Sequence, residues 1–97
     1  MKGKAEKKAQ QELEKIVGYK YPIIRTNIRY KYGEMDFMGR REDGKWDVYE
    51  IKSTQRNNLI SKAKKQLKQI EIYFKERESN YGASFLYISN LKQIIPM

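Results

Sequence analysis

Two short segments contain the residue types best suited to chemistry on a phosphate group. The first reads Gly-Glu-Met-Asp over residues 33–36, and the second reads Glu-Ile-Lys over 50–52. Hard ions such as Mg²⁺ prefer carboxylate oxygens, so Asp36 and Glu50 could hold one ion that keeps several waters. A lysine two residues after a metal-binding carboxylate, as Lys52 is, can orient a water and stabilise charge on a phosphate.

The residue types that are missing narrow the chemistry further. The chain has no histidine and no cysteine. Their absence excludes the usual general base, thiolate metal sites, disulfides, and the Ser-His and Cys-His nucleophile pairs. Any catalysis must therefore use carboxylates, lysine, tyrosine or a hard metal ion.

The charge balance indicates the kind of partner. Lys and Arg number 21 against 12 for Asp and Glu, which gives a formal net charge of +9. This excess favours a polyanionic partner, most commonly nucleic acid, although a merely soluble lysine-rich surface is the alternative. We expect no membrane partner, because no segment is long and apolar enough. The polar N-terminus predicts an intracellular, cytoplasmic protein.

The elements that must position the acidic segments follow from hydrophobic periodicity. The chain of 97 residues predicts one domain, 1–97, with one thin core. We expect an α/β (α+β) fold in the order αβββαβ, with a mixed sheet flanked by helices. The expected elements are helices over 4–17 and from 57 or 58 to about 78, and strands over 19–30, 34–40, 45–52 and 83–88, with 91–95 left unassigned.

Apolar residues at helical spacing predict which helix faces are buried. The expected stripes are Ala5, Ala9, Leu13 and Ile16 on the first helix, and Leu59, Ala63, Leu67, Ile70 and Phe74 on the second. Asn57 or Asn58 is the expected N-cap of the second helix, since asparagine caps helices well.

The hairpin between the two acidic segments decides whether they meet. A two-residue Asp-Gly loop would place Asp36 opposite Ile51 and split the charges across the sheet. A three-residue loop over 42–44, with Gly44 in the left-handed region, places Asp36 opposite Glu50. We predict this second register, because a site needs Asp36 and Glu50 on one face. Carboxylates that face each other in this way repel unless a cation lies between them. The alternative for Glu-x-Lys alone is a solvated ion pair.

The order of these segments resembles the PD-(D/E)XK nuclease superfamily, particularly its small Holliday-junction-resolvase-like and endonuclease-like members. The resemblance covers about residues 3–88, with Met35 where the name-giving motif has proline. The matching segments are the helix opening Gly3, Glu6 and Ala9, the Asn-x-Arg strand at 27–29, the acidic segments at 33–36 and 50–54, and the Gln-x-x-x-Tyr pattern from Gln69 to Tyr73, as in RecB-like nucleases.

The resemblance implies a restriction-endonuclease-like core and a Mg²⁺- or Mn²⁺-dependent nuclease. It assigns Asp36 and Glu50 as metal ligands, and Lys52 as the catalytic lysine. The backbone of Ile51 is a further expected ligand, because hard ions also bind backbone carbonyl oxygens. Glu6 is implied to help hold the metal or its waters, and the alternative is that Glu6 is a solvated helix glutamate.

Further residues are expected to support this site or to contact the substrate. Glu34 is implied either to bond Lys52 or to be a further ligand. Gln69 and Tyr73 are the expected helix contribution, with Gln66 as the alternative glutamine. The residues expected to contact nucleic acid are Arg29, Ser53, Thr54 and Lys62.

The function implied is hydrolysis of phosphodiester bonds, in DNA rather than RNA, by an endonuclease that recognises structure or backbone rather than sequence. A homodimer presenting two sites is also expected, through Tyr87, Leu91, Ile94 and Ile95. One alternative is a non-catalytic nucleic-acid-binding module on the same fold. Against it, a binder has no reason to keep Asp36 and Glu50 together. A basic RNA-associated protein of unrelated fold is the third candidate.

Overall fold

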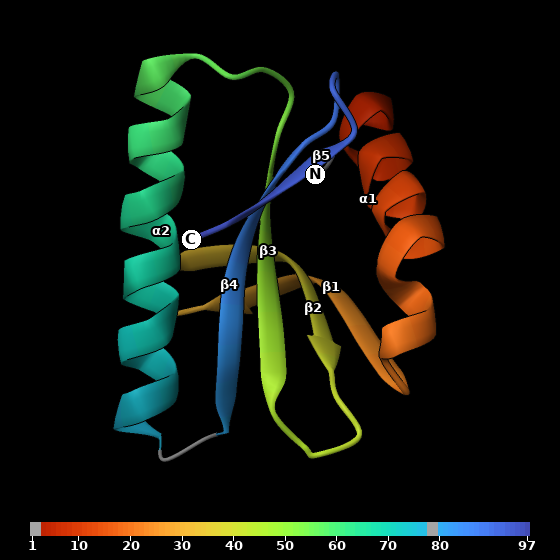
Figure 1. The fold of residues 1–97 in the computed structure, drawn as a ribbon. Coiled ribbons are helices and arrows are strands. Elements are labelled where there is room, and N and C mark those ends of the chain that lie inside the picture. The colour runs from red at the N-terminus through yellow and green to blue at the C-terminus, as the bar shows by residue number, and fades with distance from the viewer. Residues whose placement is uncertain (1–2, 78–79) are drawn as a thin grey trace.

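The computed structural model describes residues 3–77 and 80–97, which form two helices against one sheet (Figure 1). Strands β1 to β5 lie side by side in chain order, with β3 and β4 parallel and the other neighbours antiparallel. The elements are α1 (Lys4–Val17), the 3-10 helix η1 (Gly18–Lys20), β1 (Ile23–Tyr30), β2 (Gly33–Arg40), β3 (Trp46–Lys52), α2 (Asn57–Glu76), β4 (Tyr81–Ile88) and β5 (Gln93–Pro96). The expected mixed sheet with flanking helices is confirmed.

The expected order αβββαβ is short by one strand. Residues 93–96 form β5, which pairs antiparallel with β4. Ile94 packs against the core beneath α1, and Ile95 packs against the core beneath α2. Because these adjacent apolar residues serve opposite faces of the sheet, the segment lacks the alternation that indicates a half-buried strand.

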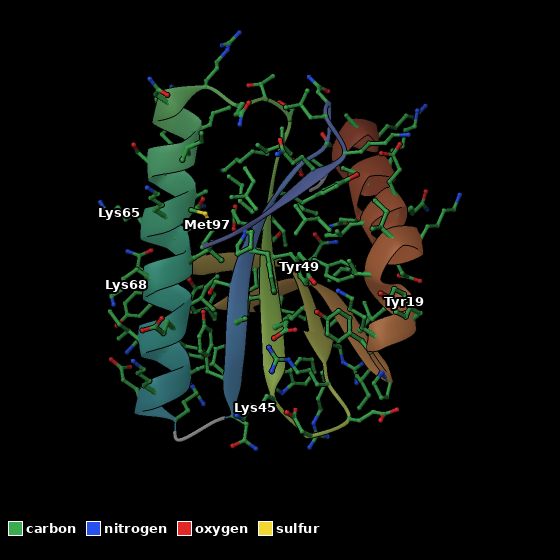
Figure 2. The ribbon with its side chains drawn as sticks, in the orientation of Figure 1. Tyr19, Lys45, Tyr49, Lys65, Lys68 and Met97 are labelled. Atoms are coloured by element: carbon green, nitrogen blue, oxygen red, sulfur yellow. The ribbon has the colours of Figure 1, made fainter. Side chains whose placement is uncertain are left out.

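The helices cover opposite faces of the sheet, and each face has its own core (Figure 1). The α1 core consists of Ala9, Leu13, Val17, Tyr21, Phe37, Tyr49 and Tyr87. The main α2 core consists of Met35, Met38, Val48, Leu67, Ile70 and Phe74. Figure 2 labels Tyr49, which lies in the middle of the molecule.

The buried face of α1 is rotated from the expected stripe. Ala9 and Leu13 are buried, but Ala5 and Ile16 are exposed, and Gln10 and Val17 are buried instead. The prediction was wrong because it used the positions of apolar residues alone and so left out the polar Gln10. Residues 10, 13 and 17 lie on one face of the helix.

The α2 stripe is confirmed at Ala63, Leu67, Ile70 and Phe74, whereas Leu59 is half-buried. The N-cap prediction is wrong: Arg56 is the N-cap, and it makes no side-chain capping bond. The expected end near 78 lies outside the described residues.

Tyr87 was expected on a contact surface, and this expectation is wrong. Its side chain is fully buried, because it projects from the face of the sheet that α1 covers and packs in the α1 core. Leu91, at 55% exposure, and the half-buried Ile94 and Ile95 stay as candidates for a dimer contact. No helix within 3–77 and 80–97 is long and apolar enough to cross a membrane.

Candidate active site

The turn between β2 and β3 has the predicted three-residue form. The Arg41 N–H donates to the Lys45 carbonyl at 2.8 Å, and the Gly44 N–H donates to the Arg41 carbonyl at 2.9 Å. Gly44 has φ +87, as its position requires. The strand register pairs Phe37 with Tyr49. The same offset continues to Arg40 and Trp46, so the predicted loop and the register beside it are confirmed. Asp36 and Glu50 come one residue beyond the last pair of this ladder, where the same offset would set them opposite each other.

A break in β1 and β2 turns Asp36 toward β3. In a regular strand Met35 and Phe37 would share a face, but Met35 lies in the α2 core and Phe37 in the α1 core. On β1 the corresponding residue is Asn27, whose φ of 54 is in the left-handed region that asparagine tolerates. Asp36 Oδ2 accepts the Ile51 N–H at 3.0 Å, so the side chain takes the place of a ladder bond.

The buried side chain of Gln10 holds this break from α1. Its Nε2 donates to Asn27 Oδ1 at 2.7 Å and to the carbonyl oxygen of Asp36 at 3.2 Å. One amide group therefore links α1 to both irregular strands beside a candidate ligand. The sequence analysis did not identify Gln10 as a site residue, because a single glutamine in a polar helix does not indicate burial. Its position on the helix face next to Ala9 and Leu13 could have indicated it.

Gln10→Leu is expected to lower the free energy of unfolding by about 1–3 kcal/mol, because the Asp36 carbonyl and the Asn27 amide oxygen lose their buried donor. Gln11→Leu, on the exposed neighbouring residue, should change it by less than about 0.5 kcal/mol. Urea titrations of both variants measure the difference. Equal effects of the two substitutions would show that the Gln10 amide does not hold the strands.

A cavity of about 210 Å³ collects most of the expected site residues. Its lining comes from α1, β2, β3 and α2. The lining residues are Glu6, Gln10, Glu34, Asp36, Glu50, Ile51, Lys52 and Gln66. The structure thus brings the expected ligands and lysine together with Glu34, and with Gln66 rather than Gln69.

Gln69 and Tyr73 do not line this cavity. Tyr73 packs its ring on Tyr30, with centroids 5.0 Å apart, and the Arg77 guanidinium lies 4.6 Å from the Tyr73 centroid. Gln66, one turn earlier on α2, reaches the cavity, and its Oε1 is buried with no hydrogen-bond partner among the described residues. Helical spacing alone could not distinguish these glutamines, because the choice depends on where α2 crosses the sheet.

The carboxylates of Asp36 and Glu50 are both buried, at 7% and 3% exposure. Lys52 Nζ lies 3.5 Å from Glu50 Oε1. Burial and the neighbouring Asp36 raise the pKa of Glu50 to about 8, and Lys52 offsets only part of this rise. The cavity therefore favours a proton, or another cation, between the two carboxylates near neutral pH.

Asp47 shows how the same fold holds a buried carboxylate for structure. It is 5% exposed, and its Oδ1 contacts the Arg41 guanidinium at 2.6 Å and the Ala83 N–H at 2.9 Å. Its Oδ2 accepts the Tyr21 hydroxyl at 2.7 Å. Glu50 instead faces another carboxylate, and its Oε2 is buried with no hydrogen-bond partner among the residues described. Glu50 therefore differs from Asp47: its ion pair with Lys52 leaves one carboxylate oxygen buried without a hydrogen bond and a second carboxylate beside it.

The donors in the cavity suit a hard divalent ion that keeps several waters. Asp36 and Glu50 supply carboxylates, Ile51 has a backbone carbonyl, and the exposed Glu6 lies at the rim. Within residues 3–77 and 80–97, no cluster of three or more acidic side chains is arranged to hold a metal. Any ion here would therefore rely on two carboxylates, a carbonyl and water, which is a donor set that Mg²⁺ accepts.

The residues expected to contact nucleic acid lie outside this cavity. Ser53 lines an adjoining groove. Arg29 is exposed on β1, where it pairs across the sheet with Glu34, and Lys62 is exposed on α2. Thr54 is half-buried just after β3.

Comparison with known proteins does not assign the chain to a family. No protein-family model matches it, and no curated protein matches it.

Proposed function

We propose that this protein is a metal-dependent nuclease that hydrolyses phosphodiester bonds, probing DNA structure or backbone rather than sequence. The observation that supports it most is the buried pair Asp36 and Glu50, with Lys52 Nζ 3.5 Å from the Glu50 carboxylate. Two buried carboxylates side by side destabilise a fold unless a proton or another cation lies between them. A bound divalent ion explains why they lie together.

Each cavity residue then has a role. Asp36, Glu50 and the Ile51 carbonyl are the groups that would hold Mg²⁺ or Mn²⁺, and Glu6 would hold the waters of the ion; the ion, when bound, polarises a phosphate and activates a water. Lys52 stabilises the negative charge that develops on the phosphate oxygens. These roles need fixed side chains, and the Ile51 N–H holds Asp36 in place.

The partner is proposed from charge. The chain has a formal net charge of +9, and Lys65 and Lys68 point from α2 away from the sheet (Figure 2). An excess of exposed lysine attracts a polyanion through counterion release, without regard to sequence. This supports recognition of the nucleic-acid backbone.

Digestion of a substrate panel tests the proposal. Plasmid, single-stranded, flapped and four-way-junction DNA, with matching RNA, are incubated with Mg²⁺, Mn²⁺ or EDTA. Cleavage of DNA that requires the divalent ion is the expected result. Binding without cleavage of any substrate would instead indicate the non-catalytic module, and cleavage undiminished in EDTA would contradict the metal role.

A further inference from the structure

A groove of about 540 Å³ adjoins the active-site cavity, with which it shares Glu6, Ile51 and Lys52. Its lining residues come from the carboxyl ends of the parallel strands β3 and β4 and from the amino-terminal parts of α1 and α2, which lie at the same end of the molecule (Figure 1). Open α/β sheets bind ligands at this end of their strands. The volume falls in the range of small-molecule sites, about 300–1,000 Å³.

The floor of the groove is tied together by backbone hydrogen bonds. The Ser89 N–H donates to the Lys52 carbonyl at 2.9 Å, and the Asn90 N–H donates to the Ser53 carbonyl at 3.1 Å. These bonds connect the segment after β4 to the segment that leaves the active site. The groove is therefore held in a fixed position relative to Lys52.

Charges along the groove balance one another. The lining lysines are Lys8 and Lys52, and the lining acids are Glu6 and Glu12, so the formal charge of the lining is zero. A run of phosphates would need an excess of positive charge. The groove suits a neutral occupant.

The uncharged lining residues indicate what kind of neutral group fits. Ser53, Ser89 and Asn90 offer hydroxyl and amide groups, while Ala5 and Leu59 offer aliphatic surface. An aliphatic wall combined with a few hydrogen-bonding groups suits a flat ring with polar edges. Nucleobases have this chemistry.

We propose that the groove holds one nucleobase, with its sugar, beside the phosphate that is cut. The proposal rests on the nuclease function and names its substrate class: a DNA strand whose nucleotide next to the cleavage point is unpaired. Taking a base out of a duplex costs free energy, and the cost is smallest when the base is already unpaired. Base capture beside Lys52 therefore gives selectivity for bulges, flaps and junctions without a base sequence being read.

Three duplexes of one sequence test the substrate class. The first is fully paired, the second carries one extra unpaired adenosine, and the third carries an abasic residue in place of that adenosine. With Mn²⁺, the bulged duplex should be cut on the order of tenfold faster than the paired one, and the abasic duplex should lose most of this gain. Equal rates for the bulged and abasic duplexes would overturn the proposal, because flexibility alone would then explain the preference.

Two groove variants outside the active-site cavity locate the effect. Leu59→Trp fills the groove, and Asn90→Ala removes an amide from its lining. Both should lower the rate on the bulged duplex and leave the paired duplex unchanged, whereas Leu91→Ala, at an exposed neighbour outside the lining, should change neither. Equal losses on both duplexes contradict base capture. If thermal melts show that Leu59→Trp unfolds, Asn90→Ala decides.

A binding measurement in EDTA separates the groove from the nuclease function. With 2-aminopurine at the unpaired position, the wild type should change the fluorescence of the base, and Asn90→Ala should reduce the change. Such a change without cleavage of any duplex supports the groove and refutes the nuclease. Metal-dependent cleavage without any change in fluorescence refutes base capture and leaves the nuclease intact.

Discussion

Lys52→Ala is expected to lose cleavage activity by on the order of a hundredfold or more, because it removes the cation nearest the developing phosphate charge. Its affinity for DNA should stay nearly unchanged, since one charge is removed from a chain whose net charge is +9. The two measurements are single-turnover cleavage with Mn²⁺ and binding of labelled DNA with EDTA.

Lys45→Ala is the matched control for this prediction. Lys45 is an exposed lysine just before β3, at the end of that strand opposite Lys52 (Figure 2). It removes the same charge without touching the cavity, so it should reproduce any small loss of affinity and keep full activity. If both variants cut at the wild-type rate, Lys52 is not part of the catalytic machinery.

The meeting of the acidic segments could be predicted from local chemistry. Glycine at position 44 suits a left-handed turn residue, and the three-residue loop then sets the register that brings Asp36 beside Glu50. The alternation of side chains along β3 likewise places Glu50 and Lys52 on one face. Both inferences need only neighbouring residues, which is why they agree with the structure.

The contributions from the helices could not be predicted in the same way. Gln10 reaches the Asp36 carbonyl because α1 is rotated to bury residues 10, 13 and 17. Gln66 lines the cavity because of where α2 crosses the sheet. These placements depend on tertiary packing. Helical periodicity does not distinguish between residues on neighbouring turns of the same helix face, such as Gln66 and Gln69. The break at Asn27 could not be predicted either, because strand periodicity assumes that side chains alternate without interruption.

In the absence of divalent ions, Glu50 should make the protein less stable as the pH rises. The folded-state pKa of Glu50 is raised from 4.5 to about 8. Between these values the unfolded chain has released the proton and the folded protein still binds it, so unfolding becomes more favourable as the pH increases. Above about 8, both states are ionised and the loss is complete. A divalent ion bound to the folded form opposes this loss.

Asp36→Asn tests whether Asp36 and Glu50 bind a metal ion. The substitution removes a proposed metal ligand and the neighbouring charge that, in addition to burial, raises the pKa of Glu50, while the new amide oxygen can still accept the Ile51 N–H. Without metal, the variant should be at least as stable as the wild type at pH 8, with an advantage that shrinks as the pH falls and the wild-type Glu50 takes up its proton. Cleavage should be abolished.

Mn²⁺ completes the test. At a hundred times its dissociation constant, an ion that binds only the folded state stabilises by about 2.7 kcal/mol, which for a domain of this size raises the melting temperature by on the order of 10 °C. The wild type should show this shift and Asp36→Asn should not. Asp47→Asn is the control, because it breaks the buried contact with Arg41. It should be destabilised with and without Mn²⁺ and keep the shift. Equal shifts in the wild type and Asp36→Asn would show that Asp36 does not bind the metal.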